Sequence, residues 1–422
     1  MDYMISGDYI ERIGKAAKLA SKSICSATSS QKNDALNEIA YALRKCKDAV
    51  LEANSTDLYH ARVIKMKESL IDRLTLDEAR IESIANACEN LTKLSDPVGM
   101  IDEGYVRPNG MRITKTRVPM GVVGIIYESR PNVTVDAASL CLKSGNAVIL
   151  RGGKEASETN KCLVKIMRAA LSRVGFDEDI IQYVEDPARD AVICLMKANE
   201  YVDVLIPRGG AGLINAVIQN ATVPVIQTGV GNCHVYVDST ADLRMAVDIV
   251  DNGKTSRPSV CNAIETCLVH KSVADEFLPR LKSRLDKSNV EIRGCDITKM
   301  ILGDDVIPAT DEDFETEFLD YILAVRVVDD LAMAIEHIQK YSTGHSECIV
   351  TQSLFAAETF KKEIDAAAVY VNCSTRFTDG EEFGLGAEIG ISTQKLHARG
   401  PMGLKELTTI KYIVEGDGQI RE

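Results

Sequence analysis

The sequence predicts an α/β protein with two alternating regions. Apolar strand-like runs alternate with helix-like segments between residues 121 and 206, and the same alternation returns between residues 243 and 371. Near-continuous apolar strands separated by helices are typical of a parallel sheet that helices cover on both faces. A strand pair at residues 105–118 lies outside both regions and indicates a small additional β element.

Helices dominate the first hundred residues, because apolar residues recur at helical spacing over 34–53 and 76–94. The strand pair that follows surrounds Asn109-Gly110, a dipeptide whose tolerance of positive φ suits a type I′ hairpin turn. An isolated hairpin is only marginally stable, so it needs a partner, and the late strand-like run 407–414 is the candidate. Both segments are candidates for a subunit interface.

Two glycine-rich turns follow predicted strands in the first region. Arg151-Gly-Gly-Lys154 follows the run 147–150, and Pro207-Arg-Gly-Gly-Ala-Gly212 follows the run 202–206. Ligands of parallel sheets bind beyond the carboxyl ends of strands, where glycines let backbone amides approach a phosphate and Arg or Lys adds charge. Neither turn has the Gly-x-Gly-x-x-Gly spacing, so each alone also fits simple turn chemistry, but together they favour a nucleotide cofactor. The other elements predicted here are strands at 121–127 and 180–184 and helices at 133–143, 155–174 and 190–198.

Cys261, in the second region, is the best candidate for a catalytic residue. A thiol is nucleophilic as its thiolate, and Cys261 follows Lys254 and Arg257 on a segment that Gly253 and Pro258 are expected to hold out of regular structure. The alternative is an inert buried thiol, because the chain has 12 cysteines and most cysteines are structural.

The elements predicted in and just before the second region alternate between strands and helices. The predicted strands are 223–227, 233–237, 263–269, 322–328, 347–350 and 369–371. The predicted helices are 243–250 and segments ending at 285 and 340. Residues 228–231 are expected to cross between domains.

Composition excludes several classes of protein. The net charge of −13 and the pI near 5.1 disfavour nucleic acid or an acidic membrane surface as the main partner. The cysteines lack the spacing of a disulfide framework or a zinc ribbon, and no metal site is expected. The start has no apolar core of a signal peptide, and no uncharged apolar run approaches the length of a membrane span. We therefore expect a cytoplasmic protein.

Several long motifs, in order, resemble the gamma-glutamyl phosphate reductase family of the aldehyde dehydrogenase superfamily. They are Tyr127-Glu-Ser-Arg-Pro-Asn-Val-Thr134, Arg151-Gly-Gly-Lys154, Lys254-Thr-Ser-Arg-Pro-Ser-Val-Cys-Asn262, Ala334-Ile-Glu-His-Ile-Gln-Lys-Tyr-Ser-Thr-Gly-His-Ser-Glu347 and Gly384-Leu-Gly-Ala-Glu388 through Gly403. The likeness covers essentially the whole chain. It implies a Rossmann-like NADP-binding domain at residues 1–103 and 119–230, a catalytic domain at 231–385 and an oligomerisation hairpin and strand at 104–118 and 400–416 in a homo-oligomer.

The resemblance also implies a reaction. NADPH would reduce L-glutamyl 5-phosphate to glutamate 5-semialdehyde with release of phosphate, the second step of proline synthesis from glutamate. Cys261 would attack the acyl phosphate to form a thioester, and the Asn132 side chain with the Cys261 backbone N–H would stabilise the oxyanion. Oligomer size and any association with glutamate 5-kinase, the preceding enzyme, are not predicted.

Two departures from aldehyde-oxidising relatives inform the chemistry. The region where those enzymes carry a water-activating glutamate reads Val225-Ile-Gln-Thr-Gly-Val-Gly231, without a carboxylate, which suits a thioester that exchanges with phosphate rather than water. Lys154 replaces a glutamate that binds the adenosine ribose in NAD-preferring members, and a cation there favours NADP. The predicted cofactor-binding residues are Arg151, Lys154, Gly209, Gly210 and Glu317, the last matched to a nicotinamide-ribose contact by counting back from Gly344.

The cations in family-matching motifs are the candidates for binding the substrate: Arg257, Arg376, Lys395, His397 and Arg399. Nothing in the sequence says which of them meets phosphate. His337 and His345 belong to the signature segment but are interpreted as satisfied core histidines rather than acid–base catalysts. Two alternatives remain: an NAD(P)-dependent aldehyde-oxidising dehydrogenase, disfavoured by the missing carboxylate, and a non-catalytic nucleotide-binding protein of the same fold, disfavoured by Cys261 and Asn132.

Overall fold

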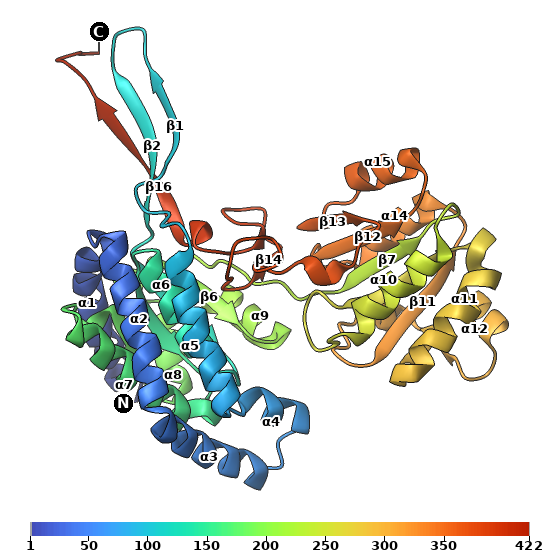
Figure 1. Cartoon of the computed structure of the whole chain (residues 1–422), viewed down its shortest axis with the longest axis horizontal. Helices are drawn as coiled ribbons and strands as arrows, with labels where there is room; N and C mark the ends of the chain where they lie inside the picture. The colour runs from blue at the N-terminus through green and yellow to red at the C-terminus, as the bar shows by residue number, and fades with distance from the viewer. Residues whose placement is uncertain (1, 422) are drawn as a thin grey trace. The chain divides into compact units, whose positions relative to one another are not determined.

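Two parallel sheets, one of four strands and one of seven, form the centres of two separate units of the chain (Figure 1). The fold is described from a computed structural model of the 422-residue chain, which describes residues 2–421. Unit 1 consists of Met1–Gln227, Leu385–Gly390 and Met402–Glu422, and unit 2 consists of Thr228–Gly384 and Ile391–Pro401. The predicted α/β class is confirmed.

The sheet of unit 1 has the strand order β5-β4-β3-β6, and all its strands are parallel. Alternate residues of β3 face opposite sides: Val122 and Ile126 pack with residues of α1 and α8, while Val123 and Ile125 are equally buried on the other side. Helices α6 and α7 contact the same sheet. The strands are β3 Val122–Tyr127, β4 Ala147–Arg151, β5 Ile181–Tyr183 and β6 Val204–Arg208, and the helices are α1 Asp2–Cys25, α2 Ser29–Lys45, α3 Lys47–Val63, α4 Glu68–Leu74, α5 Glu78–Lys93, α6 Pro131–Lys143, α7 Ser157–Arg173, α8 Arg189–Met196 and α9 Ala211–Asn220.

A three-stranded antiparallel sheet projects beyond the helices of unit 1 (Figure 1). It joins β1 Ile101–Val106, β2 Arg112–Pro119 and β16 Thr408–Glu415, so both the hairpin and its late partner strand are confirmed. The type I′ turn was wrong. Only Gly110 has positive φ, and the Gly110 N–H donates to the carbonyl of Arg107. Pro108 explains the difference, because its ring fixes a negative φ at the first central position, which a type I′ turn does not allow.

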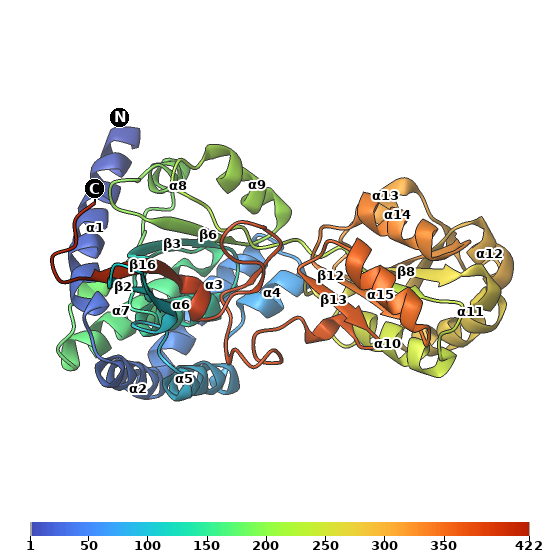
Figure 2. The same ribbon diagram turned by 90° about the horizontal axis from the view of Figure 1, so that it is seen from above.

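The sheet of unit 2 has the order β10-β9-β11-β8-β7-β12-β13, with every pair parallel. Val235 on one face of β7 packs with α10 and α11, whereas Tyr236 on the other face packs with α14 and α15. Figure 2 shows these four helices around strands β8, β12 and β13 of the same sheet. The helices are α10 Leu243–Thr255, α11 Lys271–Leu285, α12 Asp296–Leu302, α13 Asp311–Glu315, α14 Leu331–Tyr341 and α15 Leu354–Glu363; the strands are β7 Cys233–Val237, β8 Ile264–His270, β9 Glu291–Gly294, β10 Ile307–Pro308, β11 Ile322–Val328, β12 Ser346–Val350 and β13 Ala368–Val371, with β14 Ile391–Ser392 paired to β15 Gly400–Pro401.

Two local expectations differ from the structure. The predicted strand 223–227 is reduced to a single parallel bridge between Val225 and Leu205, because Pro224 has no N–H to extend the ladder. Helix α10 does not end near Val250 but continues through Gly253 to Thr255. At Gly253 the missing side chain lets the helix approach Ile264 closely, so this glycine serves packing rather than chain reversal.

Candidate active site

The loop that carries Cys261 is short and joins two regular elements of unit 2. Helix α10 ends at Thr255, strand β8 begins at Ile264, and Cys261 is half-buried between them. Because α10 is longer than predicted, Gly253 and Lys254 belong to the helix, whereas Arg257 and Pro258 lie in the loop. None of the cysteines among the described residues forms a disulfide, so Cys261 is a thiol.

Lys254 does not provide the loop with an open positive charge. Its side chain is fully buried and forms an ion pair with the carboxylate of Glu265, which is equally buried, and its Nζ also donates to the carbonyl of Ile264 at 3.1 Å. Burial lowers the pKa of Lys254, while burial raises the pKa of Glu265 to about 7 against the opposing effect of Lys254. The expected contribution of Lys254 to a cationic environment of Cys261 is therefore replaced by a neutralising pair.

The backbone of Cys261 is supported by the start of strand β7. The thiol of buried Cys233 donates to the carbonyl oxygen of Cys261, with 3.2 Å between sulfur and oxygen. A Cβ on Gly231 would overlap that same carbonyl group, so glycine is required for this close approach. The N–H of Gly231 donates to Glu317 Oε1 at 2.7 Å. Glu317, predicted to contact the cofactor, thus takes part in fixing the segment behind Cys261.

Asn262 and Arg376 hold the end of the loop. The Asn262 amide nitrogen donates to the carbonyls of Arg376 at 3.2 Å and Thr378 at 2.9 Å, and Thr375 Oγ1 donates to the Asn262 carbonyl at 2.7 Å. The guanidinium of Arg376 donates from Nη1 to Asn262 Oδ1 and from Nε to Ser256 Oγ, the latter at 3.0 Å. Arg376, predicted to bind substrate, is already engaged with both ends of the loop.

The other predicted substrate cations of unit 2 differ in their surroundings. Lys395 and Arg399 both pair with Asp365, Arg399 at 2.7 Å. Arg257 is exposed and forms no ion pair with any residue between positions 2 and 421. His397 is exposed in a left-handed conformation with φ of 71°, on the irregular segment predicted for the tail. The structure therefore brings Arg257 and Arg376 to the Cys261 loop and groups Lys395 with Arg399 elsewhere.

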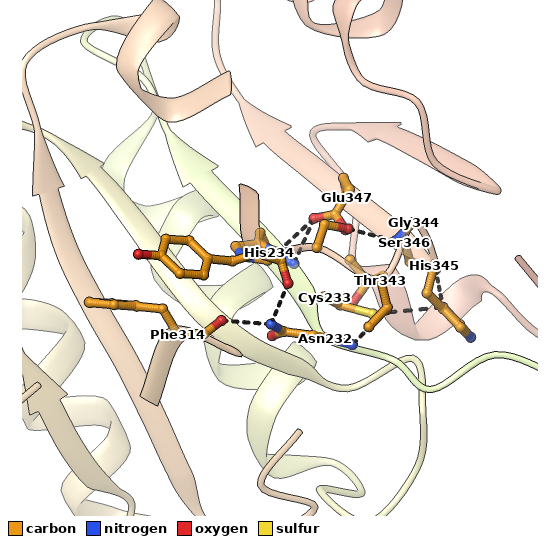
Figure 3. Close-up of polar contacts among 12 residues, drawn as sticks. Asn232, Cys233, His234, Phe314, Thr343, Gly344, His345, Ser346 and Glu347 are labelled. Carbon is orange, nitrogen blue, oxygen red and sulfur yellow. Dashed lines mark hydrogen bonds and ion pairs between the residues drawn. The ribbon is translucent and has the colours of Figure 1, made fainter. Parts of the chain in front are cut away.

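The signature segment wraps around the start of β7 and forms a buried polar cluster (Figure 3). Asn232 is held by Thr343 Oγ1 through its N–H at 3.0 Å, and its amide donates to the carbonyl of Phe314 at 2.7 Å. Glu347 accepts the N–H of His234 at 2.9 Å. The cluster therefore fixes the strand from which Cys233 reaches Cys261.

The signature histidines lie inside unit 2, as interpreted from the sequence. Burial lowers the pKa of His337 to about 2 and that of His345 to about 4, so both rings are neutral near pH 7. Arg326 donates to His337 Nδ1 at 3.0 Å, which leaves the ring proton on Nε2. Nε2 of each histidine is buried without a partner in the described part of the chain, so neither core histidine is fully satisfied.

Asn132 occupies the first turn of α6 in unit 1. Its Nδ2 donates to Asp136 Oδ2, one helical turn later, at 2.9 Å. This bond defines which end of the Asn132 amide is the nitrogen and leaves that nitrogen with one further N–H. Burial raises the pKa of Asp136 to about 6, although the hydrogen bond from Asn132 and the charge of Arg208 act in the opposite direction.

The cofactor candidates of unit 1 lie at the carboxyl ends of strands β4 and β6, which flank β3 in the sheet. Arg151 is committed to backbone carbonyls, donating to Gly152 and, at 3.2 Å, to Pro187. Lys154 is exposed and forms no ion pair within the described residues. A Cβ on Gly209 would meet the carboxylate of Glu128, and the Gly210 N–H donates to that carboxylate at 2.9 Å. The backbone amide of this turn thus already contacts an internal anion.

Four residues beside the candidate site were not singled out from the sequence: Glu128, Asp136, Gly231 and Cys233. Asp136 was within reach of sequence reasoning, because it follows Asn132 by four residues on a predicted helix. The contacts of the other three join segments far apart in the chain, and no local pattern signals them.

Residues 2–421 contain no group of three or more His, Cys, Asp or Glu that could hold a metal ion. None of the helices in these residues is long and apolar enough to cross a membrane.

Comparisons with known proteins identify relatives of this chain over most of its length. The model of the Aldehyde dehydrogenase family matches residues 4–301. Gamma-glutamyl phosphate reductase of Clostridium novyi is 56% identical over 414 residues, covering 98% of this chain and 99% of that protein. The protein of the same name from Heliobacterium modesticaldum is 58% identical over 408 residues, covering 97% of this chain and 98% of that protein.

The crystal structure of gamma-glutamyl phosphate reductase from Thermotoga maritima is similar to this chain with a TM-score of 0.95. It shares 51% sequence identity and covers 98% of this chain and 100% of its own. Similarity of this extent spans both units. The chain belongs to the aldehyde dehydrogenase family and, within it, to the gamma-glutamyl phosphate reductases.

Proposed function

We propose that this chain reduces L-glutamyl 5-phosphate to L-glutamate 5-semialdehyde with NADPH and releases phosphate, in proline biosynthesis. The observation that carries the proposal is the full-length similarity to enzymes of that name, together with a half-buried thiol on a loop that is fixed at both ends.

The chemistry assigned to the chain begins with Cys261. Its thiolate attacks the carbonyl carbon of the acyl phosphate, the C–O bond to phosphate breaks, and a thioester to Cys261 remains. The oxyanion formed on the way is stabilised by the free N–H of the Asn132 amide and by the Cys261 N–H; losing one such donor costs on the order of 100-fold in rate. The carboxylate-free segment from Val225 to Gly231 supplies no base to activate water against the thioester.

The residues of unit 1 fit a nicotinamide dinucleotide, which would supply the hydride that reduces the thioester. Lys154 is an exposed cation just beyond a parallel strand, as a ribose 2′-phosphate requires. Arg151 Nε is buried without a partner among residues 2–421, and we assign this donor to the same ligand. Gly209 and Gly210 stay assigned to the cofactor phosphates, which must then compete with Glu128 for the Gly210 N–H.

Arg257 is the residue we assign to the phosphate of the substrate. It lies on the Cys261 loop and is exposed, and its charge is not balanced by an ion pair in the described chain. Lys395, His397 and Arg399 remain assigned to substrate binding, and we now assign them to its amino-acid end. Pairing with Asp365 lowers the charge that Lys395 and Arg399 present. Glu317 remains assigned to the cofactor.

We assign the projecting sheet of β1, β2 and β16 to the assembly of a homo-oligomer. Its exposed apolar residues support this assignment: Ile101, Tyr105, Val106, Tyr412 and Val414 are between 48% and 65% exposed. Removal of residues 408–422 is expected to reduce the number of subunits in the oligomer, as measured by sedimentation. An unchanged number of subunits would contradict the assignment. The reduced thiols suit the cytoplasm, where we place the enzyme.

The reverse reaction tests the proposed function without the labile acyl phosphate. NADP⁺ reduction is measured with glutamate 5-semialdehyde, with and without inorganic phosphate, for the original protein and for Cys261→Ala. We expect reduction only when phosphate is present, and none with Cys261→Ala, which should still bind NADPH by fluorescence titration. Reduction without phosphate would indicate an aldehyde oxidiser, and activity of Cys261→Ala would contradict the nucleophile. A lack of reduction by the original protein would favour a non-catalytic role.

A further inference from the structure

We propose that Arg376 is a positioning residue that clamps the Cys261 loop, and that it does not bind the substrate directly. The proposal rests on the proposed function, since it assigns to Arg376 a role in placing the nucleophile. Ser256 directly follows helix α10, and Asn262 lies two residues before strand β8. One guanidinium donates to both side chains, from Nε to Ser256 Oγ at 3.0 Å and from Nη1 to Asn262 Oδ1.

The geometry of arginine suits this task. The guanidinium is planar, keeps its charge and presents its N–H groups in a rigid fork, so two bonds from one group fix the distance between two acceptors. Here the acceptors stand on either side of the loop that contains Cys261. Opening the loop would therefore break a charged hydrogen bond, which is worth more than a neutral one.

The turn that carries Arg376 is itself tied to the loop. Thr375 Oγ1 donates to the Asn262 carbonyl, and the Asn262 amide donates back to the carbonyls of Arg376 and Thr378. Ser374 Oγ caps this turn by accepting the Arg376 N–H at 3.3 Å. Asn262 is 4% exposed, so these bonds are shielded from water. The backbone thus brings the Arg376 side chain to the loop before any substrate is present.

The charge of Arg376 is also felt at the thiol. Burial lowers the pKa of Arg376, as does the nearby charge of Arg257, whereas Asp379 and Cys261 act in the opposite direction. Arg376 and Cys261 are therefore close enough to interact electrostatically. Arg257 carries the second positive charge of the loop and, unlike Arg376, is exposed. The two arginines therefore have different roles: Arg376 holds the loop, and Arg257 binds the anionic substrate.

A double-mutant cycle between Arg376 and Ser256 distinguishes the clamp from substrate binding. The variants are Arg376→Gln, Ser256→Ala and their combination, assayed for kcat and for the KM of semialdehyde and phosphate in the phosphate-dependent reverse reaction. We expect Arg376→Gln to lower kcat about 30-fold with each KM within about twofold, because a displaced nucleophile slows chemistry rather than binding. Ser256→Ala alone should lower kcat about threefold, as expected for one hydrogen bond, and should add nothing in the Arg376→Gln background.

Arg376→Lys keeps the charge but offers no fork, so its kcat should lie between those of the original protein and Arg376→Gln. Arg244→Gln, which removes an exposed arginine from α10 in the same unit, is the matched control and should leave kcat unchanged. If Arg376→Gln does not fold, as judged by thermal unfolding, the cycle is run with Arg376→Lys and read by the same criterion.

The proposal would be overturned by a large rise in KM at unchanged kcat, or by a double variant whose loss equals the product of the two single losses. Either result would return Arg376 to the substrate site. Failure of the proposed function has a different signature, because the original protein would then reduce NADP⁺ without phosphate or not at all, before any variant is compared. If Cys261→Ala is inactive and the kcat losses of the two single variants multiply in the double variant, the clamp role of Arg376 is rejected and the proposed function is kept.

Discussion

The buried thiol of Cys233 donates a hydrogen bond to the carbonyl oxygen of Cys261, with 3.2 Å between the two atoms. Burial raises the pKa of Cys233 well above its usual value, so the group stays protonated and remains a donor. The two cysteines therefore have opposite assignments. One is held as an inert thiol in the first position of β7, and the other is presented on a half-buried loop.

Gly231, two residues before Cys233, is expected to be intolerant of any side chain. In Gly231→Ala the Cβ would overlap the Cys261 carbonyl, which is backbone and can only move with the loop. We expect kcat to fall by about 100-fold or more, because small displacements of a nucleophile are costly. Gly7→Ala is the control: a Cβ at Gly7 meets no atom within 4 Å, and alanine inside a helix should add about 0.5–1 kcal/mol of stability. Full activity of Gly231→Ala would contradict the close packing of Gly231 against the Cys261 carbonyl.

The buried pair of Lys254 in α10 and Glu265 in β8 is expected to stabilise the two elements that flank the Cys261 loop. Lys254→Met leaves a buried carboxylate without its cation and should lower the free energy of unfolding by about 3–5 kcal/mol. Lys254→Met combined with Glu265→Leu removes both charges and should recover most of that loss. Urea unfolding of the three proteins measures the difference. Equal losses in the single and the double variant would show that packing, and not the uncompensated charge, is responsible.

The main elements were predictable from the sequence because their signals are local. Apolar strands alternating with helices gave both parallel sheets, and the hairpin was found from Asn109-Gly110 although its turn type depended on the neighbouring Pro108. The end of α10 was missed for the opposite reason. Gly253 disfavours a helix locally, but tertiary packing against Ile264 and burial of the Lys254 side chain keep the helix intact.

The candidate site was predictable only in part. Cys261 and Asn132 could be named because each stands in a long motif. The contacts that hold them could not be predicted, except for that of Asp136. Cys233 and Arg376 are far from Cys261 in sequence and approach it only in the folded chain. Arg376 was identified as an important cation, but the sequence does not reveal that its guanidinium is already bonded to Ser256 and Asn262.

Lys154 is expected to determine the choice between NADPH and NADH. Arg151, three residues earlier, is engaged with the carbonyls of Gly152 and Pro187, which leaves Lys154 as the exposed cation of this turn. Lys154→Gln should raise the KM for NADPH about tenfold and leave that for NADH nearly unchanged, because only the former carries a 2′-phosphate. Steady-state kinetics with both cofactors measures the ratio. A parallel rise in both KM values would mean that Lys154 contacts a part common to the two molecules.

Asp136 is expected to make the stability of the protein depend on pH in a defined window. Burial raises its pKa to about 6 in the folded chain, whereas the unfolded chain loses this proton near pH 4, the ordinary value for aspartate. Ionisation therefore disfavours the folded state: the stabilising effect of the protonated form is present below pH 4 and is lost as the pH rises to 6.

Asp136→Asn should remove that loss while its amide oxygen still accepts the Asn132 N–H. We expect the variant to match the original protein at pH 4 and to exceed its free energy of unfolding by up to about 2 kcal/mol at pH 7, with the partial exposure of the side chain reducing the gain. Asp275→Asn, which removes an exposed carboxylate from α11, is the control. Urea unfolding at both pH values gives the comparison. Parallel pH profiles for Asp136→Asn and the original protein would mean that Asp136 titrates alike in the folded and unfolded chains.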